Sequence, residues 1–178
     1  MKSLILESST EYALLAETGG SELHLAGGPS LSKMLATEIK KFTPPFSRIV
    51  LGIGPGSFTG IRVVAAMAQA LAYGWKIPLF TASSLTAFAP PAEHFAIAFD
   101  AKSGGLYVQI GFDAPRLLKL EEAGIVLETM PLIASPHPDK ILQRLPHLRG
   151  KQWRETRPNG ALLEKYAVLA AHPLTLNY

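Results

Sequence analysis

The chain has 178 residues, of which 48% are hydrophobic and 17% are charged, a composition that excludes an intrinsically disordered protein. It has no cysteine, which excludes disulfides, thiol chemistry and cysteine-bound metals. The net charge is only +3, and the longest apolar segment is too short and too interrupted to span a bilayer, so we expect a cytoplasmic protein.

The first part of the chain predicts strands before helices. Residues 2–7, 13–16 and 22–26 are short apolar runs, and their close spacing predicts an antiparallel meander. Residues 30–42 then carry apolar side chains at helical spacing and end before Pro44-Pro45, which predicts a helix.

Further elements are predicted in this order: a strand at 48–53, a helix at 61–73 that Gly74 can end, a strand at 78–81, a short helix from 83 or 84 to 88, and strands at 95–99 and 106–112. Beyond Asp113 prolines interrupt the pattern, and helices are predicted only at 139–145 and 159–171. Strands followed by alternating helices and strands indicate a mixed α/β sheet covered by helices.

The segment Gly54-Pro55-Gly56-Ser57-Phe58-Thr59-Gly60-Ile61-Arg62 joins a strand to a helix through a glycine turn. Such a turn is a geometry that binds anions. It lacks the lysine of a Walker A loop, and its glycines miss the dinucleotide fingerprint by one place. Ser57 and Thr59 are either phosphate ligands or helix caps, and we favour capping.

The predicted helix 61–73 is unusually rich in alanine. Only Arg62, Gln69 and Tyr73 are polar, and their spacing places them on one seam. A helix that is apolar almost all round must be covered on more than one side, either by the chain's own core or by a partner.

Positive charge is concentrated between Asp139 and Arg157, where six basic residues stand against two acidic ones. This basic tract is either an attractive surface for RNA or an acidic partner, or simply a solvated face.

The Gly54 to Arg62 segment resembles the signature of the TsaB (YeaZ) family. Residues 4–10 are similar to the family's opening strand and loop, residues 68–85 to the stretch after the signature, and residues 98–107 to its D-A-R-x-G-E-V-Y segment. The resemblance covers roughly residues 2 to 110. Members of this family are subunits of the bacterial machinery that makes threonylcarbamoyladenosine at position 37 of tRNA.

The resemblance implies a fold of the actin/Hsp70/sugar-kinase (ASKHA) type with two related lobes. We expect an N-terminal lobe at residues 1–98 and a C-terminal lobe at residues 99–178. The chain is short for the family after residue 112, so the second lobe is expected to be reduced.

The resemblance also implies a noncatalytic scaffold and activator subunit with no catalytic residue, metal or cofactor of its own. Its expected partners are a TsaD-type catalytic subunit and a TsaE-type ATPase, with tRNA contacted through the complex and a homodimer formed by the isolated chain. In the family, pairing uses helices that match residues 30–42 and 61–73. The implied signature-loop residues are Gly54, Pro55, Gly56, Ser57, Phe58, Thr59, Gly60 and Arg62, and the implied interface residues are Met34, Leu35, Glu38, Arg62, Ala65, Ala66, Ala68, Gln69, Ala72 and Tyr73.

Two alternatives are kept. A small ASKHA-type ATPase or kinase would place Glu7, Ser8, Thr10 and Asp100 around phosphates, but Glu7 stands where ATP-hydrolysing relatives of this fold have aspartate. A glycoprotease-like peptidase would need a metal pair or an activated nucleophile, and no histidine has a mate at metal-binding spacing. If Ala68 faces outward, Ala68→Glu is expected to abolish partner association and leave the monomer folded.

Overall fold

The computed structural model of the chain describes residues 1–26, 28, 30–42, 44–102 and 104–177. It divides into two compact units, the first made of residues 1–87 and 158–178 and the second of residues 88–157. This division differs from the expected boundary after residue 98, because strand β6 (Ala96–Asp100) belongs wholly to the second unit and the end of the chain returns to the first. The returning segment pairs with a strand of the first unit, which sequence spacing does not reveal.

The first unit contains a six-stranded sheet in the order β11-β5-β4-β1-β2-β3. Its strands are β1 (Ser3–Glu7), β2 (Tyr12–Glu17), β3 (Glu22–Ala26), β4 (Arg48–Gly52), β5 (Leu79–Ala82) and β11 (Val168–Leu169). The predicted antiparallel meander is confirmed, because β1 pairs with β2 and β2 with β3 in antiparallel register. Strands β4 and β5 run parallel to β1, as helical crossovers require.

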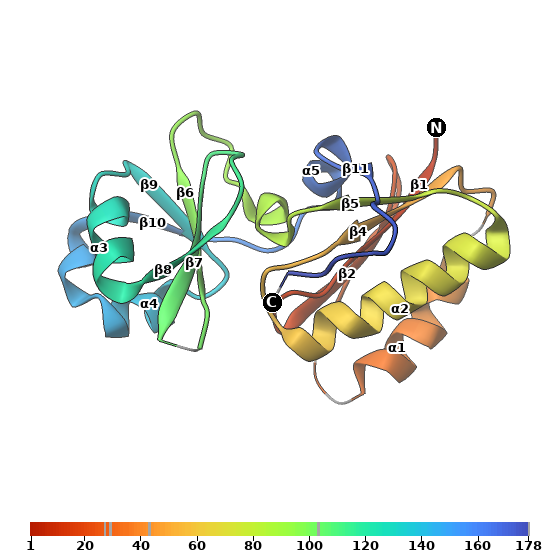
Figure 1. The fold of residues 1–178 in the computed structure, drawn as a ribbon, viewed down its shortest axis with the longest axis horizontal. Helices are drawn as coiled ribbons and strands as arrows, with labels where there is room; N and C mark the ends of the chain where they lie inside the picture. Colours follow the sequence, from red (N-terminus) through yellow and green to blue (C-terminus); the bar gives the residue numbers. More distant parts are fainter. Residues whose placement is uncertain (27, 29, 43, 103, 178) are drawn as a thin grey trace. The chain divides into compact units, whose positions relative to one another are not determined.

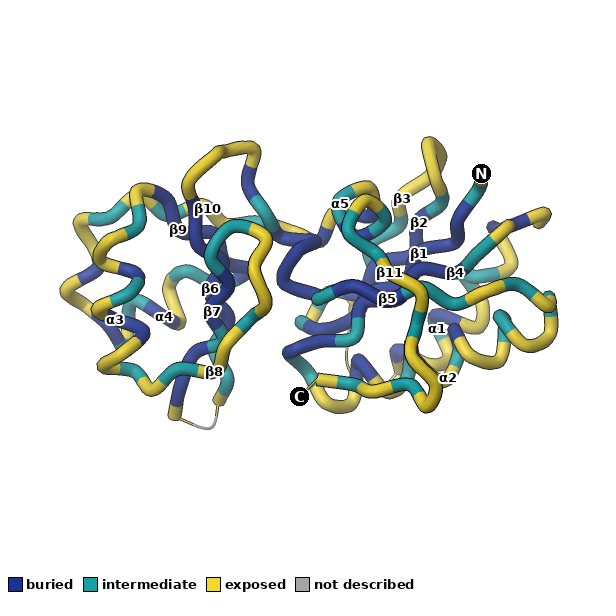
Figure 2. Tube along the Cα trace, turned by 45° about the horizontal axis from the view of Figure 1, so that its top comes forward, coloured by how far each residue is buried: buried dark blue, intermediate teal, exposed yellow. Residues whose placement is uncertain are grey.

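Helices cover both faces of this sheet (Figure 1). Helix α1 (Leu31–Glu38), its 3₁₀ extension Ile39–Lys41 and α2 (Phe58–Trp75) lie on one face, and α5 (Gly160–Lys165) lies on the other. Side chains alternate along β1: Leu4 and Leu6 pack in the core under α2, whereas Ser3 bonds to α5. Figure 2 shows β1 and β4 buried along almost their whole length.

Two predicted helices of this unit have different bounds in the structure. Gly74 lies inside α2, which continues to Trp75 because that ring stacks on Phe46; the helix ends where Lys76 adopts a left-handed backbone at φ 53°. The predicted helix at 159–171 was too long. Asn159 caps α5, which ends at Lys165, and Val168–Leu169 then pair with Phe80 and Thr81 as β11.

The second unit contains a five-stranded sheet in the order β10-β9-β6-β7-β8. After β6 come β7 (Gly105–Ile110), β8 (Arg116–Lys119), α3 (Leu120–Glu128), β9 (Leu132–Ser135), α4 (Pro138–Arg144), a 3₁₀ turn at Pro146–Gly150 and β10 (Gln152–Glu155). Its core joins α3 and α4 to the sheet through Ala123, Leu127 and Ile141.

The two units share one strand order, which the sequence does not display as a repeat. In each, three antiparallel strands are followed by a helix, a parallel strand, a second helix and another parallel strand, giving β3-β2-β1-β4-β5 and β8-β7-β6-β9-β10. The predicted mixed α/β class is therefore confirmed. The second unit is the smaller one, but it keeps all five strands of the shared order.

Candidate functional site

The turn between β4 and α2 carries the Gly54 to Arg62 signature, and several of its backbone donors are bonded within the first unit. The N–H of Gly54 donates to Ser84 Oγ at 2.9 Å, and the N–H of Ser57 donates to the Ser9 carbonyl at 2.6 Å. Ser57 Oγ accepts from the N–H of Gly60 at 3.3 Å, so Ser57 is the N-cap of α2, as predicted. Thr59 is a helical residue and does not cap.

Two glycines of the signature are required because other segments approach them closely. Gly54 has a φ of +93°, and a Cβ there would collide with the carbonyl oxygen of Asn177. A Cβ at Gly60 would collide with the carbonyl of Ser8. The glycine pattern thus has a packing explanation that involves no ligand.

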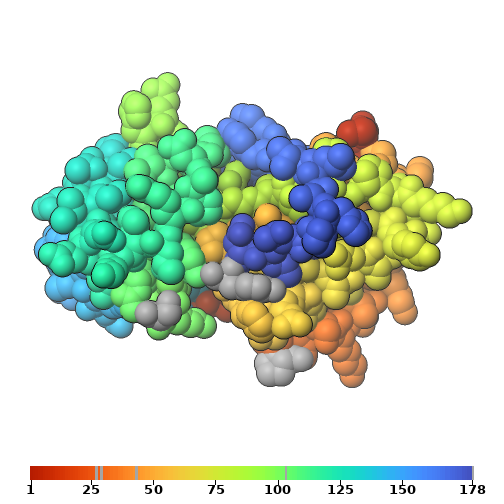
Figure 3. All heavy atoms as spheres, viewed as in Figure 1, coloured from red at the N-terminus to blue at the C-terminus, as the bar shows by residue number. Residues whose placement is uncertain are grey.

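The end of the chain secures the other side of this turn. The N–H of Asn177 donates to the Ile53 carbonyl at 2.8 Å, and Leu174 and Leu176 pack against the core of the first unit. Figure 3 shows these last described residues, in dark blue, beside the gold surface of the residues that begin α2.

A cavity of about 370 Å³ opens beside the turn, within the first unit. Its lining combines hydroxyl side chains, glycine backbone and two apolar side chains: Ser8, Thr10, Gly28, Leu31, Ser57, Thr59, Gly60 and Val63. The Ser8 hydroxyl is fully buried and has no hydrogen-bond partner among the residues that the structure describes. The sequence named Ser8 only as a residue of the alternative ATPase site, and it could not show that the hydroxyl is buried, because that burial depends on how the turn packs against β1.

Glu7 ends β1 on the opposite face of the sheet from Leu4 and Leu6. Its Oε1 accepts from the N–H of Ser9 at 2.6 Å, and its Oε2 has no hydrogen-bond partner among the described residues. The side chain is fully buried, and this desolvation raises the pKa of Glu7 to about 7, although the nearby polar groups of Ser9, Ser84 and Ser8 lower it in part. The residues expected around phosphates belong to two different units: Glu7, Ser8 and Thr10 lie in the first unit, and Asp100 lies in the second.

Helix α2 has a buried side and an exposed side. Ile61, Val64, Ala65 and Ala68 face the sheet and are buried. Arg62, Ala66, Gln69 and Tyr73 are all exposed, and their spacing of four, three and four residues forms one line along the helix; we call these four residues the exposed stripe. The predicted seam of Arg62, Gln69 and Tyr73 is part of it.

The other residues that were expected at the interface differ in how far they are buried. Leu35, Ala65 and Ala68 are buried in the core of the first unit, so they are corrected from contact residues to core residues. The expectation for Ala68→Glu required an exposed Ala68 and therefore no longer applies. Met34, Glu38 and Ala72 are half-buried, and Glu38 forms an ion pair with Lys41 at 2.5 Å.

Aromatic side chains stand at both ends of the exposed stripe. Tyr73 has 89% of its surface exposed, and Phe58 has 53%. The Arg62 guanidinium lies 5.0 Å from the centre of the Phe58 ring, a cation–π contact that holds both side chains at the surface. Phe58 and the exposed Ala70 were absent from the expected interface. Their spacing could have indicated them, because Phe58 lies four residues before Arg62 and Ala70 lies three residues before Tyr73.

The basic tract in the second unit is partly committed to internal contacts. Arg144 pairs with Asp100 and also donates to the Gly105 carbonyl. Lys151 Nζ donates to the Glu128 carbonyl at 2.8 Å. These two cations therefore hold the second unit together, while Arg149 and Arg154 are exposed.

Two other kinds of site are absent from the part of the chain that the structure describes. No group of three histidine or acidic side chains is arranged to hold a metal ion. No described helix has the length and apolar character needed to cross a membrane.

Comparison with known families identifies the chain's relatives. Residues 28–119, just over half of the chain, match the family model described as "TsaD: tRNA N6-adenosine threonylcarbamoyltransferase". A Haemophilus influenzae protein named "tRNA threonylcarbamoyladenosine biosynthesis protein TsaB" is 43% identical over 65 residues, which are 33% of this chain. The chain belongs to the family of that model, and the relatives that it resembles carry the name TsaB. The Escherichia coli TsaB protein is 33% identical over 85 residues, 44% of this chain and 36% of that protein.

The matches to TsaB sequences are local. The matching stretch spans only 28% of the length of the TsaB protein from Haemophilus influenzae, and the same share of the one from Bacillus subtilis. Structural similarity extends much further. YeaZ from Pseudomonas aeruginosa superposes with a TM-score of 0.70 over 93% of this chain and 90% of that chain, at 21% identity. The TsaB (YeaZ) fold is thus present through both units.

Proposed function

We propose that this chain is a noncatalytic scaffold and activator subunit of the complex that forms N6-threonylcarbamoyladenosine at position 37 of tRNA. The names of its TsaB relatives support a role in this pathway. The observation that carries the proposal is the exposed stripe of α2 with its aromatic ends Phe58 and Tyr73.

The exposed stripe has the character of a contact surface for another folded subunit. Ala66 and the neighbouring Ala70 leave the helix backbone accessible to close approach, and Tyr73 offers a large side chain that is almost fully exposed. Aromatic side chains and arginine are the residues that most often dominate the binding energy of interfaces. We assign this surface to a TsaD-type catalytic subunit.

The noncatalytic part of the proposal rests on the signature turn. The N–H groups of Gly54, Ser57 and Gly60 are each bonded to an acceptor of this chain. A turn whose donors are used internally serves to position α2, and this arrangement favours a scaffold over a nucleotide-hydrolysing site.

Further partners belong to the same proposal. A TsaE-type ATPase joins the assembled complex, tRNA is contacted through that complex, and the exposed basic residues Arg149 and Arg154 are candidates for this contact. Without its partner, the isolated chain forms a homodimer through the exposed stripe, because the aromatic surface of Phe58 and Tyr73 at its ends seldom stays uncovered. A cytoplasmic location follows from this role.

The first prediction concerns partner binding. Ala66→Glu and Tyr73→Glu each place an unpaired carboxylate in the assigned contact, which must be desolvated on binding. We expect either change to weaken binding of the TsaD-type subunit by about tenfold or more, measured by isothermal titration calorimetry. Size-exclusion chromatography of the isolated variants should show a shift from dimer to monomer.

The matched control is Ala161→Glu. Ala161 is an exposed alanine in α5, on the opposite face of the same sheet, so the variant adds the same charge away from the stripe. It should bind like the unmodified chain. Unchanged binding of both stripe variants would rule out the assigned surface, and nucleotide turnover by the isolated chain with ATP and magnesium would instead support the small ATPase.

A further inference from the structure

We propose that Glu7 is a positioning residue for the signature turn: its buried carboxyl holds both ends of the turn, through Ser9 and through Ser84, and changes that hold when it gains or loses a proton. The inference concerns the first unit alone. It rests on the proposed function only where it extends to partner binding. It gives β1 control over the geometry in which α2 begins.

One arm of this contact runs through Ser9 to the start of α2. Glu7 Oε1 accepts from the N–H of Ser9 at 2.6 Å, and the Ser9 carbonyl accepts from the N–H of Ser57 at 2.6 Å. Ser57 is the N-cap of α2, and Phe58 is the first residue of the helix. Two short hydrogen bonds therefore connect the carboxyl to the cap that sets the direction of the helix.

The second arm runs through Ser84 to the start of the turn. The N–H of Ser84 donates to the Gly54 carbonyl at 2.8 Å, and Ser84 Oγ accepts from the N–H of Gly54 at 2.9 Å. Glu7 lies against the same hydroxyl, since a Cβ added to Gly52 would be 2.8 Å from both Glu7 Cγ and Ser84 Oγ. Because Ser84 Oγ already accepts, its own proton is left to donate to the carboxyl beside it.

Two buried atoms next to these arms have no hydrogen-bond partner among the residues that the structure describes, namely Glu7 Oε2 and Ser9 Oγ. Such groups are costly, so an arrangement that pairs them is favoured. An ionised carboxylate only accepts, and it draws in hydroxyl protons through charge-assisted bonds that are stronger than neutral ones. A neutral carboxyl donates its own proton and needs an acceptor. The two protonation states therefore require opposite orientations of the same hydroxyls.

The change of state falls near neutral pH. Burial raises the pKa of Glu7 to about 7, and the polar groups of Ser9, Ser84 and Ser8 lower it in part. Below this pH the neutral carboxyl predominates and the hold on the turn is weaker. Above it the carboxylate predominates, and the charge-assisted bonds tighten both arms.

Other titratable side chains around β1 determine which control is needed. The neighbours of Glu7 on the adjacent strands are Leu14 in β2 and Gly52 in β4. His24 stands in the same row, because Leu14 pairs with both Glu7 and His24. Histidine is the side-chain type that ordinarily changes charge near neutral pH. The charged and titratable side chains on the elements packed around β1, and on β3 beyond β2, are Tyr12, Glu17, Glu22, His24, Arg48, Arg62, Glu164 and Lys165.

The test follows the carboxyl and the turn in one NMR titration of the full chain, from about pH 5.5 to about pH 8.5. The carboxyl carbon of Glu7 and the amides of Ser9, Gly54 and Ser57 should shift together, with one midpoint at about pH 7. Glu7→Gln should remove the response of all three amides. Ser84→Ala removes one arm only, so it should remove the response at Gly54 and keep it at Ser9 and Ser57.

His24→Gln is the matched control and should leave the common midpoint unchanged. The inference is overturned if the three amides do not follow the Glu7 carboxyl carbon, or if His24→Gln removes their response. It is also overturned if the Gly54 amide titrates in Ser84→Ala as it does in the unmodified chain. The titration of the unmodified chain gives the first of these results without any variant having to fold.

Partner binding extends the test to the surface of α2. We expect the TsaD-type subunit to bind the unmodified chain about fivefold more tightly at pH 8 than at pH 6, and Glu7→Gln to lack this difference, by isothermal titration calorimetry. Equal binding at the two pH values would overturn this extension. Full binding by Ala66→Glu and Tyr73→Glu would reject the proposed function alone, whereas independent titration of the carboxyl and the turn would reject the role of Glu7 alone.

Discussion

The carboxyl group of Glu7 has only half of its hydrogen bonds satisfied. Oε1 takes the N–H of Ser9, Oε2 has no hydrogen-bond partner among the described residues, and burial raises the pKa to about 7. The unfolded chain has an ordinary pKa of 4.5 at this position. Because the folded chain holds the proton more tightly, raising the pH between these two values favours the unfolded state.

This difference predicts a pH dependence of stability. The free energy of unfolding should fall by about 3 kcal/mol as the pH rises from 4.5 to 7, from Glu7 alone. Glu7→Gln keeps the shape of the side chain and removes the titration. The variant should therefore gain stability relative to the unmodified chain as the pH rises from 4 to 8, measured by urea unfolding. A constant difference between the two proteins across this range would show that Glu7 does not titrate as described.

At the scale of a single element, α2 combines a tightly packed face with an exposed one. Ala68 is fully buried against the sheet, whereas Ala66, two residues earlier, is exposed. The same substitution should therefore act on folding at one position and on association at the other. This contrast separates structural from interface residues within one helix.

Ala68→Glu is accordingly predicted to destabilise the first unit. It would force both extra volume and an unpaired charge into a closed core, at a cost of about 3 kcal/mol or more. Ala66→Glu should change the free energy of unfolding by no more than about 0.5 kcal/mol. Thermal unfolding followed by circular dichroism checks both. Equal melting temperatures for the two variants would contradict the burial described for α2.

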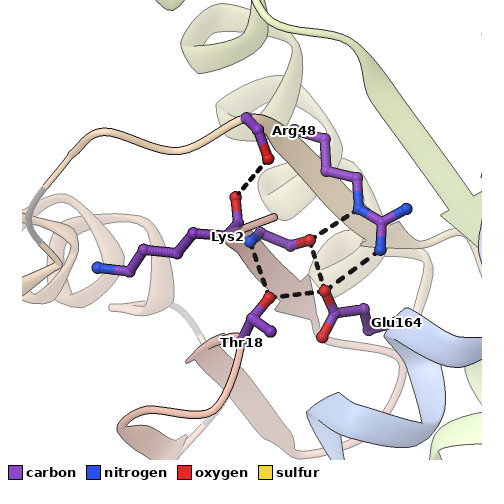
Figure 4. A network of polar contacts seen from close by, with 6 residues as sticks. Lys2, Thr18, Arg48 and Glu164 are labelled. Atoms are coloured by element: carbon purple, nitrogen blue, oxygen red, sulfur yellow. Dashed lines mark hydrogen bonds and ion pairs between the residues drawn. The ribbon is translucent and has the colours of Figure 1, made fainter.

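At the scale of the whole molecule, the return of the chain to the first unit depends on a polar network around Glu164 of α5 (Figure 4). Glu164 Oε1 accepts from Ser3 Oγ and Thr18 Oγ1, both at 2.6 Å, and from Arg48 at 3.2 Å. One carboxylate thus connects α5 to β1, to the end of β2 and to β4. Figure 4 shows the Thr18 and Arg48 side chains meeting the same oxygen of Glu164.

Glu164→Gln is predicted to lower the free energy of unfolding of the first unit by about 1 kcal/mol, after allowance for solvent screening of this half-buried group. Burial raises the pKa of Glu164, but the bonds from Ser3, Thr18 and Arg48 outweigh it, so the pKa lies below 4.5. The network is therefore complete above pH 4.5 and is lost as the pH falls through the lowered pKa.

Denaturant unfolding at pH 7 and pH 3 checks this prediction. The difference between Glu164→Gln and the unmodified chain should be largest at pH 7 and shrink in acid. Glu155→Gln, an exposed position in β10, is the control and should show no such dependence. A difference that grows in acid would show that Glu164 stabilises the fold in its protonated form.

Local patterns were sufficient for much of the first unit and, in the second, for β6, β7 and α4, but not for the other elements of the second unit. The meander, both helices on one face of the sheet and the Ser57 cap follow from spacing that neighbouring residues determine. In the second unit, strands of four residues such as β8 and β9 are too short to show a period. Helix α3 did carry a signal that was missed: Leu120, Ala123 and Leu127 are at helical spacing, and two acidic residues stand in the first turn.

The amino-acid sequence by itself determined the fold class, the family and the seam of polar residues on α2, because periodicity and motif spacing are properties of adjacent residues. Only the tertiary structure decided that Ala65 and Ala68 are core, that Ser8 is buried beside a cavity, and that residues 158–177 complete the first unit. Those facts depend on contacts between segments far apart in the chain, such as Glu164 with Ser3, and no local pattern encodes which distant segment will cover a given face.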